Sequence, residues 1–228
     1  DAEGFEAGNV TGTANVLAAA KHAGIKRFVH VSSLSAREPQ LSEYGASKLR
    51  GEKLVGNSML DWTIVRPPGV YGPGDTEMFD MFRMASKGFV LLPPRGRVSL
   101  IHVDDLARLL VALLPAHDGA TARIFEADDG VAGGWSHEDF ARAIGGAVGR
   151  RVATIHVPSF MLKLAARGDR LFRERRAKLT PDRASYLSHP DWTIDRTAAP
   201  PTTLWIPKVE TRAGLKETAR WYYAQGWL

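Results

Sequence analysis

The stretch Arg27-Phe28-Val29-His30-Val31-Ser32-Ser33 decides the fold class. Its β-branched and aromatic residues predict a buried strand, with Ser33 at the carboxyl end of that strand. The alanine-rich residues 7–23 before it predict a helix, and Gly24 stands where a helix commonly ends on a glycine. Residues 44–55 predict the next helix along the chain.

The same alternation continues toward the C-terminus. Further strands are predicted near residues 62–66, 98–103, 123–127 and 152–157, and further helices near 75–87, 104–114, 136–148 and 211–224. Strands that alternate with helices predict an α/β fold with a parallel sheet and helices on its faces. We expect this pattern to cover residues 1–150, and a smaller, mainly helical lobe to cover residues 151–228.

Local signals support three of these helices. Asp104 is predicted to be the N-cap of the helix at 104–114, and Ser136 with Asp139 resembles a capping box at the start of 136–148. The helix at 75–87 carries the stripe Met78, Phe79 and Phe82, which is typical of a core face rather than of a cofactor site.

Composition excludes several classes of protein. The chain has 228 residues, of which 44% are hydrophobic and 24% charged, as in ordinary globular proteins. It has no cysteine, which excludes disulfides, zinc–thiolate sites and thiol nucleophiles and fits a cytoplasmic protein. No apolar run is long enough to span a membrane. The histidines show no ligand spacing, so we predict no metal site.

The net charge of +5 is concentrated in one stretch, where six basic residues crowd together: Arg167, Arg170, Arg173, Arg175, Arg176 and Lys178. Such a run can bind nucleic acid, acidic lipid or a phosphorylated ligand, but it is more often a solvated helix face. No aromatic platform or nucleic-acid motif accompanies it, so we predict no nucleic-acid partner.

Tyr44 and Lys48 are the residues that point to chemistry. They are four positions apart on a predicted helix and therefore share one face. An ordinary tyrosine has a pKa of about 10, and a nearby ammonium favours the phenolate. Such a phenol can exchange a proton with a substrate oxygen, and Ser33 could hold that oxygen by a hydrogen bond. The set fits proton transfer coupled to hydride transfer at a C–OH/C=O centre.

Tyr-x-x-x-Lys alone is a weak signal, since an ordinary surface pair gives the same spacing. Its context strengthens it, because a strand ending in serine comes directly before the helix. Ser32 and Ser35 compete with Ser33 for the serine role.

In order along the chain, six segments resemble the extended short-chain dehydrogenases/reductases of the NAD-dependent epimerase/dehydratase type. They are residues 9–17 (Asn-Val-x-Gly-Thr-x-Asn helix), 27–33 (strand ending in the active-site Ser or Thr), 44–48 (Tyr-x-x-x-Lys helix), 65–75 (segment passing the nicotinamide), 101–107 (a late motif) and 214–222 (terminal helix). The resemblance implies the C-terminal part of a Rossmann-like, doubly wound parallel sheet in residues 1–150. It also implies a substrate-lobe segment interleaved at about 72–100, and relatives of this kind often form a homodimer through the helix that holds Tyr44.

The resemblance also implies roles for single residues. Tyr44 would be the general acid/base, Lys48 would assist it and bind the nicotinamide ribose, and Ser33 would orient the substrate oxygen. Asn9 would support a proton relay behind the site. The remaining residues would contact ligands: Ser32, Pro67, Pro68 and Val70 the cofactor NAD or NADP, and Ser35, Arg97 and His102 a small-molecule substrate. For His102, a packed residue without proton chemistry is the stronger alternative.

The sequence departs from the family pattern at the dinucleotide fingerprint. No Gly-x-x-Gly-x-x-Gly loop follows a strand in a βαβ unit, although glycines occur at 69, 72 and 74 and at 145, 146 and 149. We therefore expect the chain as given to be truncated, to bind NAD(P) poorly and to be inactive, because the pyrophosphate cradle is missing. The choice between NAD and NADP is left open.

A second departure concerns the substrate. Nucleotide-sugar epimerases of this family often carry Arg-Asp where this chain has Val98 and Ser99, although Arg95 or Arg97 could substitute. This favours a reductase of a small or hydrophobic carbonyl compound. Two alternatives stay open: a sugar or nucleotide-sugar epimerase/dehydratase, and a non-catalytic NAD(P)-binding sensor or assembly subunit.

Overall fold

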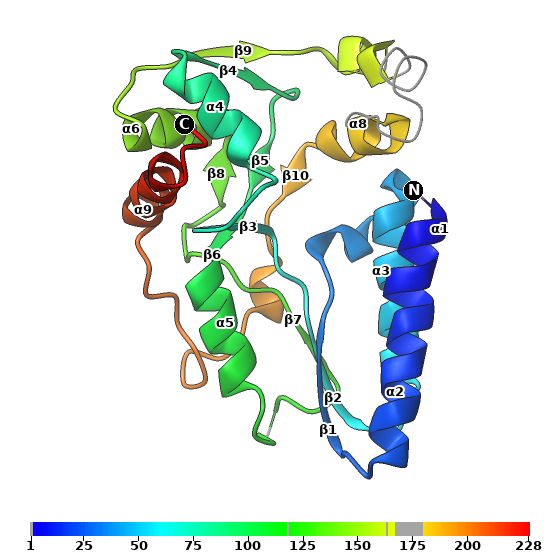
Figure 1. Ribbon diagram of the computed structural model, residues 1–228. Coiled ribbons are helices and arrows are strands. Elements are labelled where there is room, and N and C mark those ends of the chain that lie inside the picture. The colour runs from blue at the N-terminus through cyan, green and yellow to red at the C-terminus, as the bar shows by residue number, and fades with distance from the viewer. Residues whose placement is uncertain (1, 118, 163, 167–179) are drawn as a thin grey trace.

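The computed structural model describes residues 2–117, 119–162, 164–166 and 180–228. Its main sheet consists of three parallel strands in the order β1 (Arg27–Val31), β2 (Asp61–Val65) and β7 (Arg123–Phe125). Helices cover both faces of this sheet (Figure 1). The predicted α/β class with parallel strands is therefore confirmed.

Two long helical segments pack on one face of the sheet. The first runs from α1 (Ala2–Phe5) through the π-helical turn η1 (Glu6–Thr11) into α2 (Gly12–His22), and the second is α3 (Glu43–Gly56). The first segment thus begins about five residues earlier than predicted. The hydrophobic pattern of the sequence does not predict its π-helical turn η1. That turn lies against α3, where a Cβ on Gly51 would stand 2.7 Å from the Asn9 carbonyl oxygen.

The alternation of side chains along β2 divides the core between the two faces. Ile64 packs with Leu17 and Val55 from α2 and α3. Val65 points to the opposite face and packs in the cluster around Leu109 of α5 (Val103–Ala112). Both strand residues are fully buried, as expected for a strand covered by helices on each side.

β1 differs from the prediction of a buried strand. Its residues are only half-buried, and Val31 is 41% exposed. The reason is its position, because β2 is the only strand that pairs with β1 among the residues described here.

The smaller lobe is built around α4 (Phe79–Ser86), α6 (His137–Ala147) and α9 (Thr211–Ala224). Phe82, Ile144 and Tyr222 are fully buried in its core, so the predicted Met and Phe stripe is a core face. Short strand pairs complete the lobe: β3 (Gly69–Tyr71) with β6 (Leu100–His102), β4 (Phe89–Leu92) with β9 (Ala153–His156), and β5 (Arg97–Val98) with β8 (Trp135–Ser136) and β10 (Asp191–Trp192).

Two predicted helix starts are wrong. The helix expected from residue 75 begins only at Phe79, because the Asp75 carboxylate accepts hydrogen bonds from the backbone N–H of Glu77 (2.8 Å) and Met78 (3.1 Å) and holds a turn. Asp104 is not the N-cap of α5. That position belongs to His102, whose Nδ1 accepts from the Asp104 N–H at 3.2 Å.

The cap predicted for α6 is confirmed, since Ser136 Oγ accepts from the Asp139 N–H at 3.0 Å. The C-terminal helix covers the predicted residues 211–224. Across the described parts of the chain, none of the helices combines the length and the apolar character needed to cross a lipid bilayer. The basic run at 167–178 lies outside the described residues.

Candidate active site

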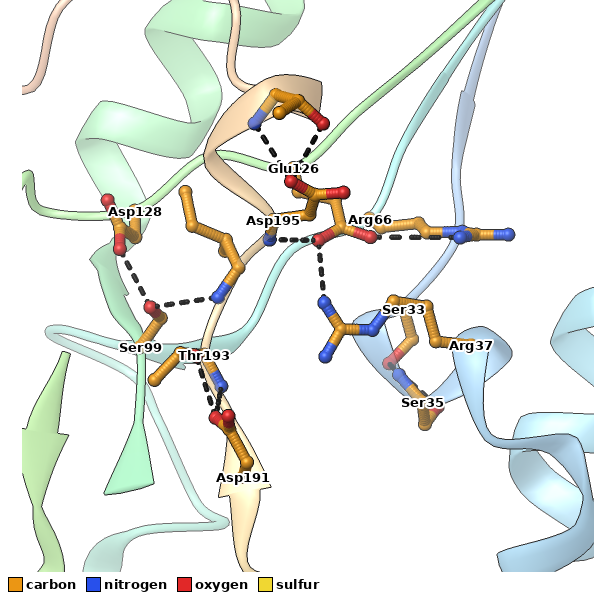
Figure 2. Close-up of polar contacts among 12 residues, drawn as sticks. Ser33, Ser35, Arg37, Arg66, Ser99, Glu126, Asp128, Asp191, Thr193 and Asp195 are labelled. Atoms are coloured by element: carbon orange, nitrogen blue, oxygen red, sulfur yellow. Dashed lines mark hydrogen bonds and ion pairs between the residues drawn. The ribbon is translucent and has the colours of Figure 1, made fainter. Parts of the chain in front are cut away.

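Ser33 lies directly beyond β1, at the carboxyl end of the main sheet. It caps the short helix η2 (Leu34–Arg37), and its Oγ accepts hydrogen bonds from Ser35 N (3.3 Å) and Ser35 Oγ (2.9 Å). Figure 2 shows the side chains of the two serines next to each other. Ser35 thus orients the hydroxyl of Ser33, and its own side chain is buried.

Tyr44 and Lys48 lie one turn apart on α3, whose start is fixed by Ser42 Oγ accepting from the Gly45 N–H at 3.0 Å. Lys48 Nζ donates to the Val31 carbonyl at the end of β1, at 2.9 Å. Burial lowers the pKa of Lys48, and the negative charge of Glu52 opposes this shift. The lysine is therefore held at the sheet edge beside the serine loop.

The ring of Tyr44 packs edge-on against Phe5 of α1, with 5.5 Å between the ring centroids. Its hydroxyl makes no hydrogen bond within the described part of the chain. Burial raises the pKa of the nearby Tyr186 to about 12, and the Tyr44 phenol adds to that shift. Tyr44 thus borders α8 (Pro181–Leu187) of the C-terminal segment.

Asn9 is connected to the tyrosine helix rather than to the phenol. Its Nδ2 donates to Ser47 Oγ at 2.9 Å, and Ser47 Oγ donates to the Tyr44 carbonyl at 2.8 Å. This chain of bonds links Asn9 to the backbone that carries Tyr44.

A row of ion pairs between arginines and buried glutamates crosses the carboxyl edge of the sheet. It was not predicted from the sequence. Arg66, just beyond β2, donates to both carboxylate oxygens of Glu52 at 2.8 and 2.6 Å. Its other guanidinium nitrogen lies 3.7 Å from Glu126, just beyond β7. Arg37 also pairs with Glu126, at 3.0 Å (Figure 2). Glu52 and Glu126 are almost fully buried.

One signal in the sequence could have revealed this row. Arg66 and Glu126 each stand one residue after a strand of the parallel sheet, which brings their side chains to the same sheet edge. Glu52 lies one helical turn beyond Lys48 and therefore on the same face of α3.

The C-terminal segment closes over this edge. Asp195 N donates to Glu126 at 2.8 Å, and the Glu43 N–H at the start of α3 donates to the carboxylate of Asp182 in α8 at 3.0 and 3.1 Å. Leu34, directly after Ser33, packs with Trp192. Tyr186 stacks on Trp192 at 4.6 Å. The serine loop therefore borders an apolar, aromatic wall.

The residues predicted to contact a cofactor lie around the same edge, but several already have protein partners. Ser32 Oγ donates to Glu52 at 2.5 Å, and the Pro67 carbonyl accepts from the Leu34 N–H at 3.0 Å. Val70 packs in the core on the α5 face, and Pro68 is half-buried.

Among the described residues, no hydrogen bond or ring contact connects Ser33 to Arg97 or His102. Arg97 donates to the carbonyls of Gly133 and, at 2.8 Å, Gly134 in the smaller lobe. His102 is 1% exposed and packs edge-on against Tyr71 with 5.2 Å between ring centroids, which is the packed alternative named above.

The model of the NAD-dependent epimerase/dehydratase family matches residues 1–127, more than half of the chain. The chain belongs to this family. The resemblance noted from the sequence is thereby confirmed, and the Tyr44 helix and the serine strand both lie within the matched part. The family is NAD-dependent, which agrees with the predicted cofactor NAD or NADP.

The chain is similar to two relatives with different named activities. Ceramide reductase from Caulobacter vibrioides is 36% identical over 99% of this chain and 71% of its own length. UDP-glucose 4-epimerase from Vibrio cholerae is 28% identical over 93% of this chain and 68% of its own length.

The fold agrees with solved structures. MoeE5 in complex with UDP-glucose and NAD matches 95% of this chain and 71% of its own with a TM-score of 0.68, at 21% identity. This likeness shows the Rossmann-like fold alone. The family and the two relatives support the coarse activity of an NAD-dependent oxidoreductase or epimerase.

Proposed function

We propose that this protein reduces a hydrophobic carbonyl compound with NADH or NADPH, using Tyr44 as the acid that protonates the substrate oxygen. The observation that supports this most strongly is the geometry of α3. Tyr44 presents a hydroxyl for which the described residues offer no hydrogen-bond partner, and Lys48, one turn further, is held at the end of β1 next to the serine loop.

The residues of the chain divide the proton chemistry between them. Ser33, oriented by Ser35, donates a hydrogen bond to the carbonyl oxygen of the substrate. Tyr44 donates a proton to the same oxygen as its negative charge develops. The positive charge of Lys48 favours the phenolate that this step leaves behind. The nicotinamide, when bound, supplies the hydride to the carbonyl carbon.

The residues present fit a nicotinamide ribose. Lys48 uses one N–H for the Val31 carbonyl, and an ammonium has three, so two donors stay available for ribose hydroxyls. The partly buried position that lowers the pKa of Lys48 also strengthens such hydrogen bonds.

Two observations favour a hydrophobic substrate over a nucleotide sugar. The position of the diphosphate-binding pair holds Ser99, whose fully buried Oγ donates to Asp128 at 2.7 Å and accepts from Ile194 N at 3.2 Å. Arg97, the proposed substitute, is engaged by backbone carbonyls. The residues beside the serine loop are apolar instead, since Leu34 and Trp192 are buried in one cluster with Tyr186 packed against it.

The ceramide reductase relative adds independent support, since ceramide is a lipid and the similarity spans 99% of this chain. The UDP-glucose 4-epimerase relative supports the second candidate, a nucleotide-sugar epimerase. The two candidates need the same tyrosine, so they are separated by substrate and not by the Tyr44 variant.

The test is an assay of the full-length protein with NADH or NADPH and a long-chain ketone, and in parallel with NAD and UDP-glucose. We expect oxidation of the reduced cofactor with the ketone and no conversion of UDP-glucose. Tyr44→Phe should lower kcat by about 100-fold or more, within the range for loss of a general acid. Tyr223→Phe, at a half-exposed tyrosine of α9, is the matched control and should keep full activity.

Conversion of UDP-glucose without ketone reduction would favour the epimerase. Unchanged turnover in Tyr44→Phe would contradict the proposed proton step, and the absence of turnover with either substrate would favour the non-catalytic sensor or assembly subunit.

A further inference from the structure

The helix α8 lies against the start of the Tyr44 helix. The Asp182 carboxylate of α8 accepts hydrogen bonds from the N–H of Glu43, the residue directly before Tyr44, at 3.0 and 3.1 Å. Tyr186 follows Asp182 by four positions, so the two side chains share one face of α8. The side chain of Tyr186 is therefore on the face of α8 that meets the first turn of α3.

The ring of Tyr186 is held in place by apolar neighbours. It stacks on the indole of Trp192 with 4.6 Å between the ring centroids. It also packs against the cluster that contains Leu34, the residue directly after Ser33. Trp192 Nε1 in turn donates to the Tyr186 carbonyl at 3.0 Å, which fixes the backbone as well. Tyr186 thus lies beside both the serine loop and the Tyr44 helix.

The hydroxyl of Tyr186 makes no hydrogen bond to any residue that the structure describes, and the same holds for Tyr44. Tyr186 is half-buried, and a phenol that is largely removed from water normally finds a partner. Burial raises the pKa of Tyr186 to about 12, and the Tyr44 phenol adds to the shift, as expected for two phenols that are close together. Two neighbouring hydroxyls at the serine loop therefore remain for a ligand.

The two hydroxyls cannot share one atom of the substrate with the serine. In the proposed reaction, the carbonyl oxygen accepts hydrogen bonds from Ser33 and Tyr44, and a carbonyl oxygen has two lone pairs. Its capacity is then used up. The donor of Tyr186 needs a second polar atom, and the position of Tyr186 next to Tyr44 requires that atom to be close to the reacting carbonyl.

We propose that Tyr186 is a specificity-determining residue whose hydroxyl binds a second polar group of the substrate, close to the reacting carbonyl. This inference rests on the proposed function and narrows its substrate class. The substrate is then a long-chain ketone that carries an oxygen or nitrogen substituent on one of the two carbons next to the carbonyl. A plain ketone leaves the Tyr186 hydroxyl without a partner, and sites built to bind a substrate hydroxyl discriminate against analogues that lack it.

The experiment compares three ketones of equal chain length with the full-length protein and NADH or NADPH. One is a plain ketone, and the other two carry a hydroxyl one or two carbons from the carbonyl. We expect kcat/KM of the parent protein to be about tenfold higher for one of the hydroxyketones than for the plain ketone, the usual contribution of one hydrogen bond. In Tyr186→Phe, which keeps the ring and its stacking on Trp192, this ratio should fall to about one.

Tyr223→Phe in α9 is the matched control, since it removes the hydroxyl of a tyrosine that is 50% exposed. It should keep the ratio of the parent protein. A parent protein without preference for either hydroxyketone would overturn the proposal. So would a Tyr186→Phe variant that keeps the parent ratio, even if it slows all three ketones, because Tyr186 would then act through Tyr44 and not on the substrate.

Calorimetric binding of the same ketones separates this inference from the proposed function. If the parent protein reduces no ketone but binds a hydroxyketone about tenfold more tightly than Tyr186→Phe does, the role of Tyr186 stands and the proposed reaction falls. If the parent protein reduces all three ketones equally well, the reaction stands and the role of Tyr186 falls. Neither turnover nor binding of the three ketones would contradict both.

Discussion

Tyr44, Lys48 and Glu52 follow one another at single helical turns on α3. The charged groups of Lys48 and Glu52 have different hydrogen-bond partners. Glu52 accepts hydrogen bonds from Ser32 and from two nitrogens of the Arg66 guanidinium. Lys48 therefore keeps a backbone carbonyl as its hydrogen-bond partner and its ammonium stays directed to the sheet edge. Ser32 and Arg66 thus bind the Glu52 carboxylate, while the Lys48 ammonium, which the proposed chemistry needs, has a separate partner.

His30 of β1 provides a test of this arrangement at the level of one residue. Burial and the positive charge of Lys48 lower its pKa from 6.5 to about 4. The unfolded chain therefore binds a proton more readily between these two values, and the free energy of unfolding should fall as the pH drops through this window. At about 1.4 kcal/mol per pKa unit, the loss is at most about 3 kcal/mol.

Urea unfolding near pH 7 and near pH 4.5 measures this effect. His30→Gln should lose much less stability between the two values than the parent protein, because it removes the group that titrates. His22→Gln, at an exposed position of α2, should keep the slope of the parent. A His30→Gln variant with the parent slope would contradict the buried position of this imidazole.

At the scale of elements, the packing of α3 against the turn η1 depends on one glycine. A Cβ at Gly51 would stand 2.7 Å from the backbone oxygen of Asn9, and a backbone atom yields less readily than a flexible side chain. We expect Gly51→Ala to lower the free energy of unfolding by about 1–3 kcal/mol.

Gly146 of α6 is the matched control, since a Cβ at this position would meet no neighbouring atom within 4 Å. Gly146→Ala should raise the free energy of unfolding by about 0.4–1 kcal/mol, because alanine restricts the unfolded chain. Chemical unfolding of the two variants gives both values. Similar effects of the two substitutions would show that α3 and η1 are packed more loosely than described.

Much of this element structure was predictable from the sequence. The strand at residue 27, the Tyr44 helix, the Ser136 cap and the terminal helix follow from hydrophobic periodicity and local cap chemistry. Ser33, Tyr44 and Lys48 could be proposed as site residues from the sequence, because they lie close together along the chain.

What was missed depends on contacts between distant residues. The late start of α4 depends on the side chain of Asp75, and that side chain makes a turn rather than a first helical turn. The row Glu52–Arg66–Glu126–Arg37 joins four segments that only the folded sheet brings together. Periodicity within one segment cannot reveal such a row.

At the scale of the whole molecule, Glu126 at the end of β7 pairs with Arg37 of η2 and accepts from the Asp195 N–H of the C-terminal segment. Its carboxylate is 3% exposed. Removing the charge of a buried partner typically costs about 3–5 kcal/mol, because the arginine is left without compensation. We expect Glu126→Gln to lower the free energy of unfolding by about 3 kcal/mol.

Glu77→Gln provides the comparison on the surface. Its side chain is 76% exposed and pairs with Arg183 at 3.0 Å, so we expect a change of no more than about 0.5 kcal/mol. Thermal and urea unfolding of both variants decides the matter. If Glu126→Gln were as stable as Glu77→Gln, the buried row would not hold the two parts of the molecule together.

The measurement that tests the central claim most directly is the transfer of deuterium from nicotinamide cofactor to substrate. The full-length protein is incubated with a long-chain ketone and NADH or NADPH that carries deuterium at the transferable position, and the product alcohol is analysed by mass spectrometry. We predict one deuterium at the carbinol carbon and about 100-fold slower transfer in Tyr44→Phe. An alcohol without deuterium, or equal rates in the parent and the variant, would contradict the account.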